Sequence, residues 1–298
     1  MSSTKEKPKK PVKTSIPMEE GLRSGHLACQ GCGAMLAMRY AQKGLGRKTV
    51  FVTPACCWTI LAGPAPKLSI ETSLLQCPFA TAAATASGVK AGLVSRGDTE
   101  TQVVVWAGDG GTYDIGIQAL SGAADRNEDI IYVCYDNEAY MNTGIQRSGG
   151  TPMKAWTMTT QGGSQRPKKD LDKIMEAHSI PYQATCTPGF PEDMVKKFQK
   201  VRGIKGFRFI RVLSPCPPGW KHDSGDTVAL SKLAVETGAF PLYEIEDGKF
   251  KLTKKVSKRK PINEYLKKQR RFRGLKDKDI EEMQQGIDAA WVEFEKRS

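Results

Sequence analysis

The sequence predicts an α/β protein with a doubly wound, mainly parallel sheet and with basic N- and C-terminal extensions. Apolar runs of strand length alternate with helical segments from Val50 to Leu213, and this alternation is typical of parallel sheets covered by helices. Lysine and arginine are concentrated in residues 1–16 and 248–276, which carry net charges of +4 and +12. We therefore expect a basic arm at 1–17, one α/β domain at 18–247 and a basic extension at 248–298.

The pattern of apolar, small and turn-forming residues places each element. Uninterrupted runs of Val, Ile, Phe and Tyr indicate buried strands, whereas apolar residues three and four apart indicate helices. The first helix is ended by Gly44 and Gly46, as helices commonly are. In chain order we expect helix 34–43, strand 50–52, helix 80–94, strand 103–107, helix 115–125, strand 130–135, helix 171–178, strand 182–186, helix 191–201, strand 206–213, helix 227–238, a hairpin at 240–250 and an amphipathic helix at 279–297.

Two further segments have a distinctive composition. Residues 148–169 are long, polar and glycine-rich, which is typical of a functional loop or an interface segment. The last helix has an apolar stripe that includes Ile280, Ile287 and Trp291. This stripe would dock either on its own domain or on a partner.

The distribution of charge limits the classes of partner. The chain has a net charge of +13, but the residues outside the two basic segments sum to −3. Basic ends alone lack the motif and fold that nucleic-acid readout needs, so we expect no nucleic acid. The ends would lie on a partner subunit or an acidic electron carrier, or form a solvated face. No apolar run approaches ~20 residues and no hydrophobic leader is present, so we expect a cytoplasmic protein that does not contact a membrane.

The strongest functional signal lies between Val103 and Thr151. An apolar strand leads into the turn Gly108–Gly111, and the next strand ends at Asn137. In doubly wound sheets, ligands bind at the carboxyl ends of the strands. Glycines allow backbone N–H groups to approach a phosphate, and the following helix favours an anion. The carboxylate of Asp109 would repel that anion unless a divalent cation such as Mg²⁺ lay between them.

Other interpretations of the glycine turn fit less well or remain open. The dinucleotide pattern G-x-G-x-x-G fails because Tyr113 occupies the third glycine position, and no P-loop pattern is present. An ordinary strand-to-helix turn, with Asp109 as a helix cap, remains an alternative on spacing alone.

Eight cysteines in a chain expected to be cytoplasmic indicate metal or redox chemistry rather than disulfides. Cys29 and Cys32 form a Cys-x-x-Cys loop, whereas Cys56, Cys57 and Cys216 follow predicted strands. One pair joined by distant single cysteines favours an iron–sulfur cluster over zinc, which usually takes two pairs. The remaining three lie in segments typical of core packing: Cys77, Cys134 and Cys186.

Together these motifs resemble a known family. Gly108-Asp109-Gly110, followed 28 residues after Asp109 by Asn137, is similar to the thiamine-diphosphate signature. The stretch Asp136–Ser148 resembles the beta subunit of the 2-oxoacid:ferredoxin oxidoreductases, most closely the pyruvate and 2-oxoisovalerate enzymes. The resemblance extends roughly from Gly25 to Phe240 and includes the segment Ser214–Trp220. It implies a thiamine-diphosphate-binding fold of the PP type.

The resemblance also implies roles for individual residues. Seven positions would bind the cofactor: Gly108, Asp109, Gly110, Gly111, Asn137, Ala139 and Asn142. Of these, Asp109, Asn137 and the carbonyl of Ala139 would hold Mg²⁺. Asn142 and Thr143 would lie beside the reacting centre as catalytic residues.

A [4Fe–4S] cluster is implied near the thiamine, and its four ligands would be Cys29, Cys32, Cys57 and Cys216. Cys57 is preferred to its neighbour Cys56 because Trp58-Thr59-Ile60 follows it in the register of the family. His26 matches a family histidine, for which a role in the site and a local hydrogen bond are both open.

The implied reaction is the CoA-dependent oxidative decarboxylation of pyruvate to acetyl-CoA and CO₂, with electrons passed to ferredoxin. The implied partners are an alpha subunit that supplies the pyrimidine-binding domain, and gamma and ferredoxin-like delta subunits. The same chemistry on 2-oxoisovalerate or another 2-oxoacid is the main alternative. More distant alternatives are a non-redox thiamine-dependent lyase, which needs no cluster, and a cysteine-rich nucleic-acid-binding protein.

Overall fold

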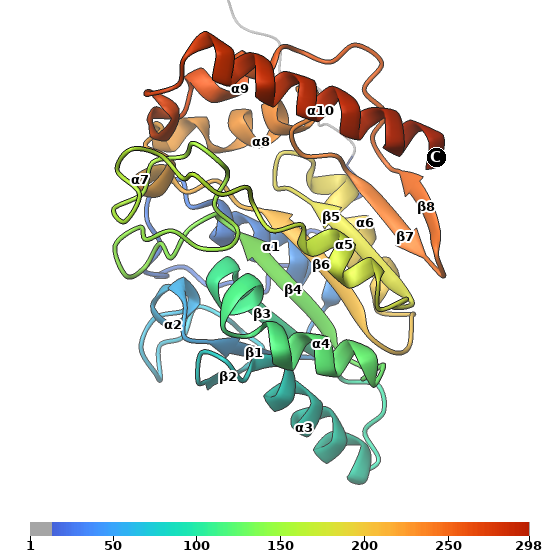
Figure 1. Ribbon diagram of the computed structural model, residues 1–298. Coiled ribbons are helices and arrows are strands. Elements are labelled where there is room, and N and C mark those ends of the chain that lie inside the picture. Colours follow the sequence, from blue (N-terminus) through green and yellow to red (C-terminus); the bar gives the residue numbers. More distant parts are fainter. Residues whose placement is uncertain (1–13, 298) are drawn as a thin grey trace, which may run out of the picture.

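The computed structural model describes residues 14–297, so the first thirteen residues of the expected basic arm lie outside the described part. An eight-stranded sheet crosses the molecule in the order β2-β1-β3-β4-β6-β5-β7-β8 (Figure 1). The strands from β2 to β5 in this order are parallel, and β7 and β8 are antiparallel. The strands are β1 Thr49–Pro54, β2 Ser73–Cys77, β3 Gln102–Gly108, β4 Ile131–Asp136, β5 Tyr182–Cys186, β6 Arg208–Leu213, β7 Tyr243–Glu246 and β8 Lys249–Leu252. The predicted doubly wound, mainly parallel fold is confirmed.

Helices cover both faces of the sheet because the central strands are apolar on both sides. In β3, Val104 and Trp106 face one core, whereas Val103 and Val105 face the other. One face carries α1 Gly33–Leu45, α2 Cys57–Leu61 and α6 Pro191–Val201. The other carries α3 Ala82–Ser95, α4 Ile117–Asp125 and α5 Leu171–Glu176.

A third apolar core lies beyond the end of β6. It joins α7 Pro217–Trp220, α8 Thr227–Glu236, α9 Ile262–Lys267 and α10 Asp277–Arg297. The last helix docks on its own chain, running across the top of the molecule in Figure 1, and its Trp291 is buried. Elements of the basic extension at 248–298 therefore pack on the domain: β8 extends the sheet, and α9 and α10 close this core.

Removing the Trp291 side chain should destabilise the chain strongly. Its indole Nε1 donates to the carbonyl of Gly238 at 2.9 Å, and its ring packs against Ile287 and Phe294. Trp291→Ala should lower the free energy of unfolding by about 3–5 kcal/mol, measured by urea denaturation. The adjacent Val292 is 51% exposed, so Val292→Ala should change that free energy by less than about 0.5 kcal/mol. Equal effects of the two substitutions would contradict the observed docking.

The structure adds elements that the sequence pattern did not indicate. β2 is an edge strand whose residues are mostly half or fully exposed, so it lacks the apolar run or alternation that marks a buried strand. α2 and α7 are single turns, which are too short for the spacing of apolar residues to indicate a helix. No helix in residues 14–297 combines the length and the apolar character that a membrane span requires.

Candidate functional site

Four neighbouring strands end in the segments that carry the predicted site residues. β1 leads to Cys56 and Cys57, β3 ends at Gly108, β4 ends at Asp136, and β6 leads to Cys216. Because these strands are adjacent in the order β1-β3-β4-β6 and are parallel, their carboxyl ends meet at one edge of the sheet. The direction of strand addition reverses between β1 and β3, which is the switch point where doubly wound sheets bind ligands.

Asp109 opens a turn that requires glycine. Gly110 to Asp114 forms one turn of π-helix, a shape that is frequent at functional sites. A Cβ atom on Gly110 would lie 2.1 Å from the ring of Tyr140, so a larger residue would displace that ring. A cavity of 290 Å³ opens against this turn. Its walls include every residue predicted to bind or act on the cofactor, together with Cys57.

Three polar groups meet at one point of the cavity wall. The side-chain amide of Asn137 approaches Asp109 Oδ1 to 2.8 Å and the carbonyl oxygen of Ala139 to 3.0 Å. Both neighbours are acceptors, so the amide either donates its N–H groups to them or presents its oxygen to a cation that all three bind. Around an octahedral Mg²⁺ with ligands at about 2.1 Å, adjacent oxygens lie about 3.0 Å apart. The two separations therefore match those of adjacent ligands in a magnesium site.

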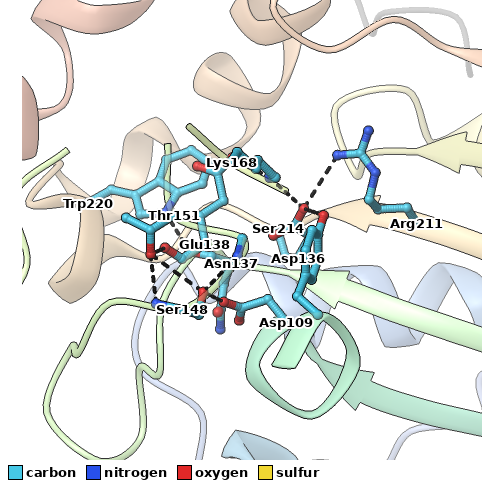
Figure 2. Close-up of polar contacts among 12 residues, drawn as sticks. Asp109, Asp136, Asn137, Glu138, Ser148, Thr151, Lys168, Arg211, Ser214 and Trp220 are labelled. Atoms are coloured by element: carbon cyan, nitrogen blue, oxygen red, sulfur yellow. Dashed lines mark hydrogen bonds and ion pairs between the residues drawn. The ribbon is translucent and has the colours of Figure 1, made fainter. Parts of the chain in front are cut away.

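Hydroxyl groups hold the buried carboxyl group of Asp109 in place (Figure 2). Ser148 Oγ donates to Asp109 Oδ2. Thr151 Oγ1 accepts the Ser148 N–H at 3.0 Å and donates to the carbonyl of Glu138 at 2.7 Å. Burial, together with the charge of Asp136, raises the pKa of Asp109 well above its ordinary value. A bound cation would favour the carboxylate and so relieve this cost.

A network of buried charges lies behind the loop that follows β4. Asp136 Oδ2 accepts from Tyr113 at 2.7 Å and from Lys168 at 2.6 Å, and Arg211 lies 3.4 Å away. Burial opposes ionisation of Asp136, but the charges of Lys168 and Arg211 bring its pKa below the ordinary value. Sequence reasoning did not identify these partners, nor Ser148 and Thr151. The one signal was the length and polarity of the loop 148–169, which supplies Lys168 and both hydroxyls.

Asn142 and Thr143 line the mouth of the cavity rather than its floor. Both are exposed, and Thr143 Oγ1 donates to Gln146 Oε1 at 2.6 Å. Gln146 Nε2 donates back to the carbonyl of Thr143 at 2.7 Å. These two hydrogen bonds between Thr143 and Gln146 fix the turn. A second chain or a substrate can therefore reach these residues from solvent.

The segment that carries Cys29 and Cys32, just before α1, packs against the segment that carries Cys216, just before α7. The N–H of Gly33, next to Cys32, donates to the carbonyl of Pro215 at 3.0 Å. Thr227 Oγ1 donates to the carbonyl of Gly31 at 2.5 Å. Burial, together with the nearby thiols of Cys32 and Cys29, raises the pKa of Cys216 to about 12. The structure thus brings the Cys-x-x-Cys loop and Cys216 together.

Cys56 and Cys57 have different surroundings. The Cys56 thiol accepts the N–H of Thr59 as the cap of α2 and contacts the hydroxyl of Tyr135. Burial raises the pKa of Cys57, and the neighbouring thiols of Cys56, Cys216 and Cys32 raise it further. Cys57 therefore lies near Cys32 and Cys216, whereas Cys56, which also lines the cavity, is engaged with Tyr135.

Within residues 14–297, no group of three or more His, Cys, Asp or Glu side chains is placed to hold a single metal ion. Cys134 and Cys186 are buried in the core, and Cys77 is half-buried at the end of β2. His26 Nδ1 accepts a local hydrogen bond from the N–H of Ala28 at 3.4 Å.

Comparison with known proteins identifies the class. The family model described as "Thiamine pyrophosphate enzyme, C-terminal TPP binding domain" matches residues 62–212. The ketoisovalerate oxidoreductase subunit VorB of Pyrococcus horikoshii is 47% identical over 294 residues, covering 95% of this chain and 94% of that protein. The pyruvate synthase subunit PorB of Methanothermobacter marburgensis is 48% identical over 284 residues, covering 94% and 99%.

A solved structure agrees with the fold. The 2-oxoglutarate:ferredoxin oxidoreductase from Magnetococcus marinus superposes with a TM-score of 0.58 at 21% identity, covering 73% of this chain and 82% of that one. The chain therefore belongs to the thiamine pyrophosphate enzymes. Within them it is a beta subunit of the 2-oxoacid oxidoreductase type, together with PorB and VorB.

Proposed function

We propose that this chain binds Mg²⁺–thiamine diphosphate and a [4Fe–4S] cluster, and that its complex converts pyruvate and CoA reversibly to acetyl-CoA and CO₂, with electrons passed to ferredoxin. The observation that carries the proposal is the cavity at the ends of β1, β3 and β4. Its wall combines the oxygen donors of Asp109, Asn137 and Ala139 with the adjacent residues Cys56 and Cys57.

The magnesium assignment rests on charge and spacing. Asp109 supplies the one carboxylate, and Asn137 and the carbonyl of Ala139 supply neutral oxygens at the separations given above. Mg²⁺ is commonly bound by one or two carboxylates together with phosphate oxygens. The turn Gly108–Gly111 would face the diphosphate, since its glycines line the cavity and leave their backbone N–H groups accessible to a phosphate.

The cluster assignment rests on the proximity of the predicted ligands, since Cys216 lies near Cys29, Cys32 and Cys57. Each thiolate of a [4Fe–4S] cluster binds a different iron, so the sulfur atoms lie farther apart than around one zinc ion. One Cys-x-x-Cys pair with two single cysteines from other segments supplies such a set. Because the pKa values of the Cys57 and Cys216 thiols are raised, metal binding must displace protons from both. When bound, the thiamine would supply the carbanion chemistry and the cluster a one-electron path.

The active site is shared with another chain in this proposal. Asn142 and Thr143 are exposed at the cavity mouth, which is where an alpha subunit with the pyrimidine-binding domain would close the site. Gamma and ferredoxin-like delta subunits would continue the electron path to ferredoxin. A cytoplasmic location follows from this partnership. The similarities of 48% to a PorB and 47% to a VorB make 2-oxoisovalerate the alternative substrate.

A substrate panel tests the proposal. The co-expressed complex, purified anaerobically, is mixed with CoA, methyl viologen and pyruvate, 2-oxoisovalerate or 2-oxoglutarate in turn. We expect CoA-dependent reduction of viologen, fastest with pyruvate. Fastest turnover of 2-oxoisovalerate would assign the chain to the alternative substrate. Turnover of none of the three by a complex with full iron and thiamine content would overturn the proposed reaction.

A further inference from the structure

The loop that presents Asn137 and Ala139 is held in an unfavourable backbone conformation. Glu138, between these two residues, has a φ of +71°, in the left-handed region that residues other than glycine rarely adopt. Such a conformation persists only when the surrounding structure holds it. The carbonyl of Glu138 accepts from Thr151 Oγ1 at 2.7 Å. This bond holds the backbone of Glu138, but its side chain needs other partners.

The side chain of Glu138 is held by a residue from the basic C-terminal segment. Its carboxylate accepts from an Nη atom of Arg271 at 2.5 Å, and from Lys168 at 2.9 Å. The side chains of Arg271 and Glu138 are only 3% and 8% exposed, so this ion pair is screened little by solvent. Arg271 Nε also donates to Gln269 Oε1 at 3.0 Å, which fixes the orientation of the guanidinium.

The same guanidinium supports the metal loop by a second route. Its central carbon lies 4.0 Å from the centroid of the Trp220 ring. Trp220 Nε1 donates in turn to the carbonyl of Asn137 at 2.7 Å, as Figure 2 shows. Trp220 ends α7, the turn that follows Cys216. Arg271 therefore contacts two groups that hold the backbone between the Asn137 side chain and the Ala139 carbonyl, and one of them belongs to the segment of a predicted cluster ligand.

We propose that Arg271 is a positioning residue for the metal site. By pairing with Glu138 and stacking on Trp220, it keeps the Asn137 amide and the Ala139 carbonyl directed at Asp109. The basic C-terminal segment thus contributes to the cofactor site from within the chain, besides any contact its exposed residues make. This inference rests on the proposed binding of Mg²⁺–thiamine diphosphate.

The test measures Mg²⁺ affinity rather than turnover. The complex is freed of Mg²⁺ and titrated with Mg²⁺ in the presence of excess thiamine diphosphate, with tryptophan fluorescence as the readout. Outer groups that orient metal ligands typically contribute 10–100-fold to affinity, so Arg271→Ala should raise the Mg²⁺ Kd by about tenfold or more. Arg271→Lys keeps the charge but not the planar fork, so it should restore part of the affinity.

The neighbouring Arg270 provides a matched control. It is exposed, and its Nε donates only to the carbonyl of Lys221 at 3.2 Å. Arg270→Ala should leave the Mg²⁺ Kd within about threefold of the wild-type value, since it touches neither the loop nor Trp220. Iron content, measured in parallel, should stay unchanged in both variants because neither residue is a cluster ligand.

A double substitution separates positioning from a general loss of stability. In a Glu138→Gln background the ion pair is already lost and only the contact with Trp220 remains, so adding Arg271→Ala should raise the Mg²⁺ Kd by a smaller factor than the same substitution does in the wild type. If Arg271→Ala fails to assemble, Arg271→Gln takes its place under the same criteria. An assembled variant whose Mg²⁺ Kd matches the wild type would overturn the inference. A wild-type complex that binds no Mg²⁺–thiamine diphosphate would instead overturn the proposed function.

Discussion

Replacing Asp109 by alanine should abolish Mg²⁺-dependent binding of thiamine diphosphate while leaving cluster iron in place. Asp109 is the one carboxylate among the three proposed oxygen ligands, and Ser148 orients it. Since groups that merely orient a ligand contribute 10–100-fold, loss of the ligand itself should raise the Kd for the Mg²⁺–cofactor complex by at least about a hundredfold. Titration calorimetry on the cofactor-free complex measures this Kd, and iron is determined on the same sample.

Two control variants distinguish loss of the ligand from loss of the fold. Asp109→Asn keeps the shape of the side chain and removes the charge, so it should bind the cofactor weakly without unfolding the site. Burial raises the pKa of Asp109, so a neutral amide should also be tolerated in the cofactor-free protein. Asp125→Ala changes an exposed acid at the end of α4 and should bind normally. Normal binding by Asp109→Ala would contradict the magnesium assignment.

Replacing Cys57 by alanine should remove most of the iron, whereas replacing Cys56 should not. Cys57 lies near Cys32 and Cys216, whereas the Cys56 thiol is engaged as the cap of α2. Cys57→Ala should therefore lose most of the broad absorbance near 400 nm of the anaerobically purified complex, with a parallel fall in iron per chain. Cys56→Ala should keep both and lose only the cap, at a cost of about 1 kcal/mol.

The adjacent pair provides its own control, because both substitutions delete one thiol within the same turn. Cys56→Ser retains a capping side chain and should restore the stability that Cys56→Ala loses. Loss of iron in Cys56→Ala with full retention in Cys57→Ala would assign the ligand to Cys56 and show that the family register is displaced by one residue here.

The sequence predicted the parts of the fold and site that depend on local pattern. Buried central strands are apolar throughout, so the sequence predicts β3 and β4. The carboxyl ends of neighbouring parallel strands also meet at one edge of the sheet. This pattern places Asp109 and Asn137 together at one edge of the sheet. The choice of Cys57 came from the resemblance, and the environments of the two thiols support it.

Other parts could not be predicted because they depend on contacts between distant segments. Arg271 and Glu138 are 133 residues apart, and nothing in a basic run of the sequence marks one arginine as buried. Ser148 is equally unremarkable until the loop folds back over Asp109. The edge strand β2 has no buried face to impose a pattern. In each case tertiary packing, rather than local propensity, decides the role of the residue.

A single-turnover measurement tests most directly that one cavity couples the thiamine site to the cluster. The anaerobic complex, loaded with Mg²⁺–thiamine diphosphate, is mixed with CoA and excess pyruvate without an electron acceptor, and its absorbance near 400 nm is followed. We expect rapid bleaching in the wild type and none in Asp109→Ala at equal iron content. No bleaching by pyruvate or 2-oxoisovalerate in a fully loaded wild-type complex would contradict the proposed coupling, as would equal bleaching in Asp109→Ala.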